Sequence, residues 1–165
     1  MAKLIILRGN SGSGKTSVAK ALQKKFGHNT MMISQDMVRR EMLWAKDGIG
    51  TKALPLLINL LGYGRKNSEI TILEGILDSG WYRPLFQKAV EEYGTNIFAF
   101  YYDLPFEETL LRHGTKPNKN EFGEEAMRRW WKEKDYINII PEQILTKDIS
   151  FPDAVEMIYK IVSEP

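Results

Sequence analysis

Four short apolar segments alternate with stretches of helical periodicity along the chain. They occupy residues 4–7, 31–33, 70–73 and 97–102, and a weaker candidate follows at 143–146. A run that is apolar at every position is typical of a parallel strand covered on both faces. The alternation of such runs with helical patterns predicts an α/β fold, in which helices cover a parallel sheet.

The ends of two helices can be predicted from local signals. Apolar residues recur every four positions over 18–26, and Gly27 follows where helices often end in a glycine. The last helix is predicted to begin near Ser150 or Asp153. The first helix therefore comes soon after the first apolar run, with only a short connection between them.

Two segments exceed a simple alternation of strands and helices. Residues 37–68 form a long, mostly helical stretch that is interrupted at 48–50, and the region 112–128 contains a polar, turn-rich part at 113–124. In open α/β sheets the ligand binds at the carboxyl ends of the strands. We expect both segments to border that edge, the first as the wall of an acceptor site and the second as a lid.

Length and composition are those of an ordinary globular chain. Its 165 residues are expected to form one domain, residues 1–165, and 43% of them are hydrophobic and 27% charged. No cysteine occurs, which excludes disulfides, thiolate metal sites and a cysteine nucleophile. No apolar run is long enough to span a bilayer, so we expect a cytoplasmic protein without a membrane partner. The formal net charge of +2 disfavours an extended nucleic-acid partner without excluding one.

Between the first strand and the first helix, eight residues match the phosphate-binding pattern G-x-x-x-x-G-K-[ST]: Gly9, Asn10, Ser11, Gly12, Ser13, Gly14, Lys15 and Thr16. The glycines allow successive backbone N–H groups to point at one anion. Lys15 supplies a positive charge for the β- and γ-phosphates of a nucleotide, and the Thr16 hydroxyl is placed to bind Mg²⁺. The helix that follows adds the partial positive charge of its N-terminus.

Asp36 follows the second apolar run, at the edge where the phosphate loop is expected. A carboxylate there is a candidate general base for an attacking hydroxyl. The competing interpretation is that Asp36, or Ser34, only caps the next helix, and local spacing does not separate the two. Arg39 lies three residues later on the same helical face, where it can bind an anionic acceptor group or simply pair with a nearby acid.

Further candidates lie after the third strand and in the lid. Glu74 ends the apolar run 70–73, a usual place for a ligand of Mg²⁺-bound water or for a group that contacts substrate. A buried structural carboxylate is the alternative, at the expense of desolvating a charge. Arg112 and Lys116 flank the start of the polar lid segment, where cations can neutralise charge on a moving phosphoryl group. For either cation alone, solvated surface charge is the more usual interpretation, and it is the pair beside a lid that indicates a function.

These residues together make the chain resemble the P-loop kinase superfamily. More narrowly, it resembles the group that contains phage polynucleotide kinase, zeta toxins and chloramphenicol phosphotransferase. The resemblance rests on the phosphate loop, the Asp36-x-x-Arg39 pattern, Glu74 and Arg112. It implies that Asp36 is the general base and that Arg39 contacts the acceptor. Lids of this group often carry an R-x-x-x-R pair, and here Lys116 occupies the second position.

The same resemblance implies a three-layer P-loop NTPase fold, with five parallel strands in the order 2-3-1-4-5 and ATP as the phosphoryl donor. We therefore predict an ATP- and Mg²⁺-dependent phosphotransferase acting on a hydroxyl of a small-molecule or nucleotide-like acceptor. Two alternatives remain open, a kinase for 5′-hydroxyls of RNA or DNA and a regulatory ATPase with water as its acceptor. The acceptor, the preference for ATP or GTP and the oligomeric state are left open. The predicted site residues are Lys15, Asp36 and Arg112 for catalysis, Arg39, Glu74 and Lys116 for the acceptor, and Thr16 with Glu74 for the metal.

Overall fold

The computed structural model of the protein describes residues 1–117 and 119–165. Its strands, in chain order, are β1 (Lys3–Gly9), β2 (Met31–Ser34), β3 (Ile70–Gly75), β4 (Ile97–Tyr102) and β5 (Glu142–Leu145). They form one sheet in the order β2-β3-β1-β4-β5, and every neighbouring pair is parallel. This order confirms the arrangement that the family resemblance implied.

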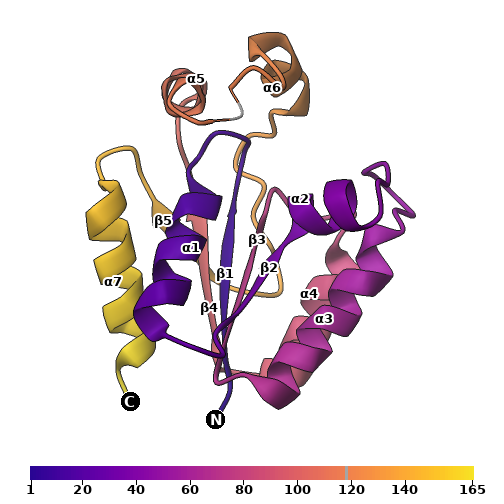
Figure 1. Cartoon of the computed structure of the whole chain (residues 1–165), viewed down its shortest axis with the longest axis vertical. Coiled ribbons are helices and arrows are strands. Elements are labelled where there is room, and N and C mark those ends of the chain that lie inside the picture. Colours follow the sequence, from indigo (N-terminus) through magenta and orange to yellow (C-terminus); the bar gives the residue numbers. More distant parts are fainter. Residues whose placement is uncertain (118) are drawn as a thin grey trace.

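The helical segments are α1 (Lys15–Phe26), α2 (Gln35–Met37), the π-helical turn η1 (Val38–Met42), α3 (Ala53–Asn67), α4 (Arg83–Tyr93), α5 (Phe106–Gly114), α6 (Glu124–Trp130) and α7 (Phe151–Ser163). α1 and α7 cover one face of the sheet and α3 and α4 the other, which gives the predicted three layers (Figure 1). α5 and α6 lie beyond one end of the sheet. Among the described helices, none combines the length and apolar character that a membrane span requires.

The continuous apolar run of β1 is explained by burial on both faces. Leu4 and Ile6 belong to the core on the side of α3 and α4, whereas Ile5 and Leu7 belong to the core on the side of α1 and α7. All four side chains are inaccessible to solvent. Successive side chains of a strand point to opposite faces, so a strand that is covered by helices on both sides must be apolar throughout.

Most helix and strand ends agree with the sequence to within a residue, although β1 and β3 run two residues further than predicted, to Gly9 and Gly75. Gly27 follows α1 and its N–H donates to the carbonyl of Gln23. Ser150 caps α7, its hydroxyl accepting a hydrogen bond from the N–H of Asp153 at 3.3 Å. β5 begins at Glu142, one residue before the predicted start of the fifth strand. The prediction of a helix beginning near Ser150 is therefore confirmed.

The prediction for residues 37–68 is only partly right, because the helical stretch is broken over a wider range. The chain has no helix or strand over 43–52, where an interruption at 48–50 alone was expected. Trp44, Gly48 and Gly50 have φ angles of 49°, 114° and 78° in this segment. Such left-handed positions cannot continue a right-handed helix, so α3 starts anew at Ala53.

The strand register brings the predicted site to one edge of the sheet. β3 lies between β1 and β2, pairing Leu7 with Glu74 and Glu74 with Ser34. The phosphate loop after β1, helix α2 after β2 and Glu74 at the end of β3 therefore share the carboxyl edge. Helices α5 and α6 lie over this edge, and both termini lie at the opposite end (Figure 1).

Two glycines of α3 provide a matched test of how this helix packs on the sheet. A Cβ at Gly64 would lie 2.5 Å from Thr71 Oγ1 and 3.1 Å from Met31 Sδ, whereas one at Gly62 would meet nothing within 4 Å. We expect Gly64→Ala to lower the free energy of unfolding by about 1–3 kcal/mol, because α3 must shift away from the sheet. Gly62→Ala should raise it by about 0.5–1 kcal/mol, because alanine favours a helix. Urea unfolding measures both, and equal stabilities of the two variants would contradict this packing.

Candidate active site

The phosphate-binding loop, residues 9–16, curls between β1 and α1 and packs against the lid. Gly14 directly precedes α1 with a φ angle of 98°, and Gly12 has a φ angle of 82°. A Cβ at Gly12 would lie 2.5 Å from the carbonyl oxygen of Thr109 in α5. Glycine is therefore required at this position by both its backbone angle and the close approach of α5.

Lys15 is buried inside the loop, with 7% of its surface exposed. Its Nζ donates hydrogen bonds to the carbonyl oxygen of Asn10 at 2.9 Å and to Ser13 Oγ at 3.2 Å. Burial lowers the pKa of Lys15 to about 8, while the charges of Glu74 and Asp36 oppose this shift. An anion placed against this buried ammonium group would be strongly attracted.

The predicted metal ligands lie next to each other. Thr16 Oγ1 donates a hydrogen bond to Glu74 Oε1 at 3.0 Å, and Glu74 is 2% exposed. Among the described residues, no group of three or more histidine, cysteine or acidic side chains could hold a metal by itself. Mg²⁺ does not need one, since it usually keeps several waters and takes one or two carboxylates together with substrate phosphates. The paired oxygens of Thr16 and Glu74 fit this requirement.

Asp36 is placed beside cations and is not the helix cap. The cap is Ser34, whose hydroxyl accepts a hydrogen bond from the N–H of Met37. This resolves the open choice between Ser34 and Asp36 as capping residue. The Oδ1 atom of Asp36 instead forms ion pairs with Arg40 Nε at 2.8 Å and with Arg39 Nη2 at 3.2 Å. Its side chain is more than half exposed, so a carboxylate oxygen remains accessible to an acceptor.

Arg39 is held by a polar network that the sequence did not predict. Its Nη1 donates to the carbonyl oxygen of Ala45 at 3.2 Å, and its Nε lies 3.8 Å from Asp47 Oδ2. Tyr82 donates to Asp47 Oδ1 at 2.6 Å and accepts from Gln35 Nε2 at 2.8 Å. Burial, followed by the hydrogen bond to Asp47, raises the pKa of Tyr82, so the phenol stays protonated. The network fixes the irregular segment 43–52 against the start of α4.

Of the two predicted lid cations, Arg112 contacts the phosphate loop directly. Arg112 Nη1 donates to the carbonyl oxygen of Ser13 at 2.8 Å, and its Nε pairs with Glu108 at 3.0 Å. Burial lowers the pKa of Lys116, and the charge of Glu74 opposes this shift more than any other neighbouring charge. Arg112 therefore lies at the phosphate loop, and Lys116 is close enough to Glu74 for the two charges to interact. Asn118, inside the predicted lid region 112–128, lies outside the described residues.

A buried histidine ties the lid segment to α5. His113 Nε2 lies 3.1 Å from the carbonyl oxygen of Lys119 and 2.9 Å from that of Phe122. Because carbonyl oxygens only accept, we assign the ring proton to Nε2 as the donor. The imidazole also stacks on the Phe122 ring, with centroids 4.5 Å apart. His113 thus has a packing role in the lid.

A fully buried arginine supports the base of the phosphate loop. Arg8, the residue before Gly9, pairs with Asp135 Oδ2 at 3.0 Å and Glu142 Oε1 at 2.8 Å. It also donates twice to the carbonyl oxygen of Leu77. A buried cation needs such complete pairing because unpaired charge is expensive to desolvate. The sequence does contain a signal for this buried arginine, since Arg8 directly follows the apolar run 4–7 within the same strand.

Asn10 links the loop to the chain that leaves the lid. Its Nδ2 donates to the carbonyl oxygen of Lys132 at 2.7 Å, and its Oδ1 accepts from the N–H of Lys132 at 2.8 Å. Both backbone groups of one residue are therefore satisfied by a single side chain. Lys132 in turn pairs with Asp78 at 2.9 Å and Asp135 at 3.3 Å. Asn10 therefore serves the shape of the site as well as its place in the phosphate-binding pattern.

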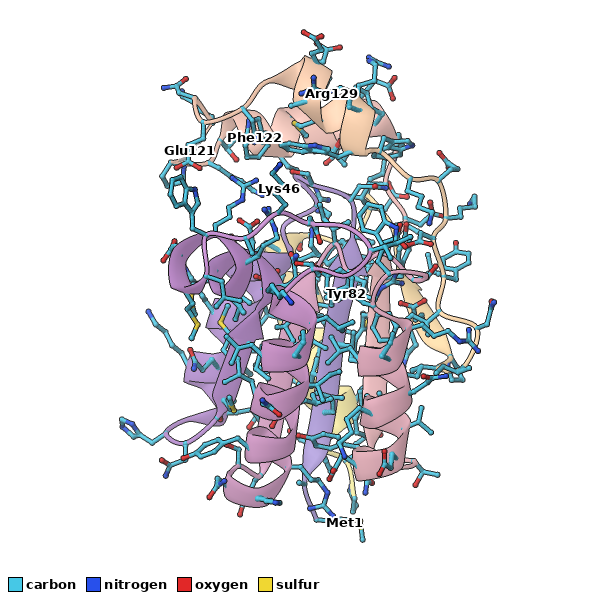
Figure 2. The ribbon with its side chains drawn as sticks, turned by 90° about the vertical axis from the view of Figure 1, so that its right-hand side faces the viewer. Met1, Lys46, Tyr82, Glu121, Phe122 and Arg129 are labelled. Atoms are coloured by element: carbon cyan, nitrogen blue, oxygen red, sulfur yellow. The ribbon has the colours of Figure 1, made fainter. Side chains whose placement is uncertain are left out.

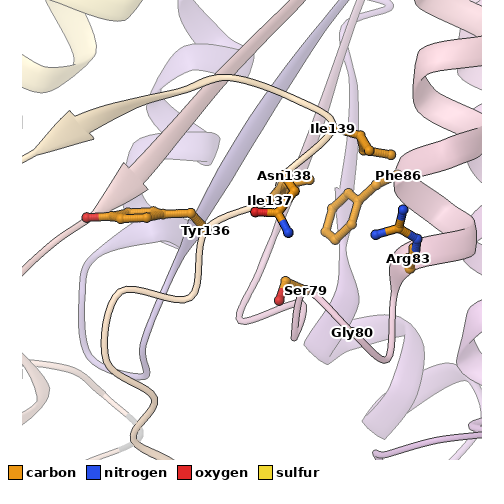
Figure 3. A pocket seen from close by; sticks show the side chains of 8 residues that line it. All are labelled: Ser79, Gly80, Arg83, Phe86, Tyr136, Ile137, Asn138 and Ile139. Atoms are coloured by element: carbon orange, nitrogen blue, oxygen red, sulfur yellow. The ribbon is translucent and has the colours of Figure 1, made fainter.

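A small cavity of about 160 Å³ lies beside the Arg8 network, away from the predicted site (Figure 3). It opens between the start of α4 and the chain before β5, and none of the predicted site residues lines it. Ser79 at its wall donates to Asp135. The lining residues are Ser79, Gly80, Arg83, Phe86, Tyr136, Ile137, Asn138 and Ile139.

The sheet order, the phosphate loop after the central strand and the cations over it define the protein as a P-loop kinase in class. Residues 2–92 match the family model described as chloramphenicol phosphotransferase-like protein. Because this match covers more than half of the chain, the protein belongs to the chloramphenicol phosphotransferase-like family. No curated protein matches the chain.

Several solved structures share the fold over nearly the whole chain. A gluconokinase from Sinorhizobium meliloti is 14% identical, with 98% of this chain and 91% of that one covered and a TM-score of 0.71. An APS kinase from Mycobacterium tuberculosis, in complex with AMPPNP and APS, is 19% identical, with 99% and 98% covered and a TM-score of 0.68. The tunicamycin resistance protein of Deinococcus radiodurans is 16% identical, with 100% and 98% covered and a TM-score of 0.66. At these identities the likeness shows the fold alone.

The buried Lys15 makes stability depend on pH in a defined direction. Its pKa is about 8 in the folded protein against an ordinary value of 10.5. Burial of the charged form therefore destabilises the fold fully below pH 8, and this penalty fades as the pH rises from 8 to 10.5. Lys15→Met removes the penalty at every pH. We expect the stability of this variant, minus that of the wild type, to fall by a few kcal/mol across that window.

Urea unfolding at about pH 7 and about pH 10 measures this difference. Lys20→Met replaces an exposed lysine of the same helix and serves as the control, for which no such change is expected. A difference between Lys15→Met and wild type that stays constant with pH would contradict the burial of a charged lysine.

Proposed function

We propose that this protein is an ATP- and Mg²⁺-dependent kinase that transfers the γ-phosphate to a hydroxyl of a small-molecule or nucleotide-like acceptor. The observation that carries the proposal is the meeting of Lys15, Asp36 and Glu74 at one edge of the sheet. Lys15 lies in the phosphate loop after β1, Asp36 follows β2 and Glu74 lies at the end of β3, three neighbouring parallel strands. Glu74 also accepts a hydrogen bond from Thr16 at 3.0 Å.

The donor side of the site consists of the phosphate loop and its neighbours. Lys15 and the loop amides hold the β- and γ-phosphates of ATP. Thr16 and Glu74 hold Mg²⁺, which when bound neutralises part of the phosphate charge. Arg112, already bonded to the Ser13 carbonyl, stands beside the loop to stabilise charge on the transferred group.

The acceptor side is served by Asp36. The acceptor oxygen forms a bond to the γ-phosphorus while the bond from that phosphorus to the β–γ bridging oxygen breaks, so that ADP leaves. The hydroxyl proton passes to a carboxylate oxygen of Asp36, which stays oriented by Arg39 and Arg40. Lys116 lies on the lid above the transferred phosphoryl group. Like Glu74, it contacts the acceptor.

A small acceptor fits the space beside Asp36. Arg39 and Arg40, which hold Asp36, line a cavity of about 720 Å³. Sites for small ligands have volumes of roughly 300–1,000 Å³. Chloramphenicol, the compound in the family's name, is one acceptor of this size to be tried.

Asp36→Asn should lower acceptor-dependent ADP release by about 10²–10⁴-fold, because an amide cannot take up the hydroxyl proton. Lys15→Ala should remove most turnover with every acceptor. ATP affinity, measured by calorimetry, should change little in Asp36→Asn, since this residue lies on the acceptor side. The assay is ADP release with a panel of nucleosides, sugars, hydroxy acids and antibiotics.

Glu41→Gln is the matched control, since Glu41 is an exposed acid of η1, directly after the Arg39–Arg40 pair. It should retain wild-type turnover. If Asp36→Asn turned over acceptors at the wild-type rate, Asp36 would not be the base. If ADP release never depended on an added acceptor and persisted at the same rate, a water-consuming ATPase would replace the kinase.

A further inference from the structure

A cationic cavity lies on the acceptor-side segment, next to the residues that hold Asp36. Its volume is about 720 Å³, and its lining residues are Arg39, Arg40, Trp44, Ala45 and Lys46. All five belong to η1 or to the irregular segment that follows it. The lid residue Phe122 lies over Arg40, with the guanidinium 6.0 Å from the ring centroid, and Lys46 lies below the lid (Figure 2). The cavity is therefore formed by the acceptor-side segment, and the lid touches one of its lining residues, Arg40.

The charges around this cavity are unbalanced. Three of its lining side chains are cations and none is an acid. The carboxylates that pair with these cations are Asp36, which receives Arg39 and Arg40, and Asp47, which lies 3.8 Å from Arg39. Lys46 has no ion-pair partner within the described part of the chain. Lys46, whose side chain is exposed, is therefore the lining cation that no carboxylate among the described residues engages.

The rim of the cavity is held in a strained shape. Trp44 has a left-handed backbone with a φ angle of 49°, which bulky residues rarely adopt, and its side chain is 92% exposed. The turn is closed by the Ala45 N–H, which donates to the Arg39 carbonyl at 2.8 Å, and by Arg39 Nη1, which donates to the Ala45 carbonyl at 3.2 Å. Strain of this kind persists where surrounding contacts enforce it and is frequent at binding sites. The turn holds an aromatic ring and a lysine beside the same opening.

We propose that the acceptor carries one anionic group, a carboxylate or a phosphate ester, which binds Lys46 and Arg40 in this cavity. The proposal rests on the proposed function, because it places the acceptor's hydroxyl at Asp36. Arg40 connects the two positions, since it lines the cavity and also contacts Asp36 at 2.8 Å. A hydroxy acid or a hydroxylated phosphate ester has both groups that this arrangement would bind.

Direct binding tests this without requiring turnover. The full-length protein is first saturated with a non-hydrolysable ATP analogue and Mg²⁺, so that added anions cannot enter the phosphate loop. Glycerol 3-phosphate, glycerate and glycerol are then titrated in turn, and the indole N–H signal of Trp44 is followed by NMR. Trp44→Phe assigns that signal among the four tryptophans. We expect saturable shifts with glycerol 3-phosphate or glycerate and none with glycerol, and the first two compounds distinguish phosphate from carboxylate.

Lys46→Gln should weaken binding of the anionic compounds about tenfold, the usual effect of losing one charge-assisted hydrogen bond. The substitution should not disturb the loop, because its tie to Thr51 uses the Lys46 carbonyl oxygen. Lys52→Gln, at an exposed lysine outside the cavity, is the control and should bind as wild type.

Absence of a saturable shift with both anions, or equal affinities in Lys46→Gln and wild type, would overturn the proposal. So would acceptor-dependent ADP release that is confined to neutral hydroxyl compounds such as glycerol or chloramphenicol, which leaves the kinase assignment intact. Failure of the kinase assignment has a different signature, since ADP release would then be independent of any acceptor even where glycerate or glycerol 3-phosphate binds.

Discussion

The parallel pairing of β1, β2 and β3 is the constraint on which the site depends. Glu74 is hydrogen-bonded into register with Leu7 on one side and Ser34 on the other. Parallel strands have their carboxyl ends at the same edge of the sheet, so the residues that follow each strand lie close together there. Thr16, Glu74 and Asp36 come from separate parts of the sequence and are neighbours only because this register holds.

The site is built from charges that the fold would be more stable without. Lys15 is buried in its loop with a lowered pKa, and Glu74 is buried opposite it. Neither would be retained for stability alone, since buried ion pairs contribute little net free energy. Arg8 is a further buried charge, at the base of the loop. Unlike Lys15, it is fully paired, with two carboxylates and the carbonyl oxygen of Leu77. Such concentrations of buried charge are typical of sites that bind charged ligands.

Features encoded by neighbouring residues were predictable from the sequence. The wholly apolar run of β1, the spacing of the loop glycines and the Ser150 cap can each be read from neighbouring positions of the sequence. The resemblance to P-loop kinases supplied the strand order, which composition and periodicity do not contain. Longer-range contacts escaped prediction. Arg8 and Glu142 are 134 positions apart and Asn10 and Lys132 are 122 apart, so no local pattern marks either pair. The irregular segment 43–52 escaped for another reason, since a left-handed tryptophan has no sequence signature.

The bond between Asn10 and Lys132 has a consequence for how this architecture can vary. The chain between the end of β4 and Lys132 is anchored at one end by the sheet and at the other by this two-way bond. A loop whose two ends are both anchored can change in length at a small entropic cost. Each doubling of its length costs about 0.6 kcal/mol. α5 and α6 lie wholly within this anchored segment, and the family model that matches residues 2–92 ends before it. This segment can therefore change in length between its two anchors, while Arg112 continues to hydrogen-bond to Ser13 of the loop.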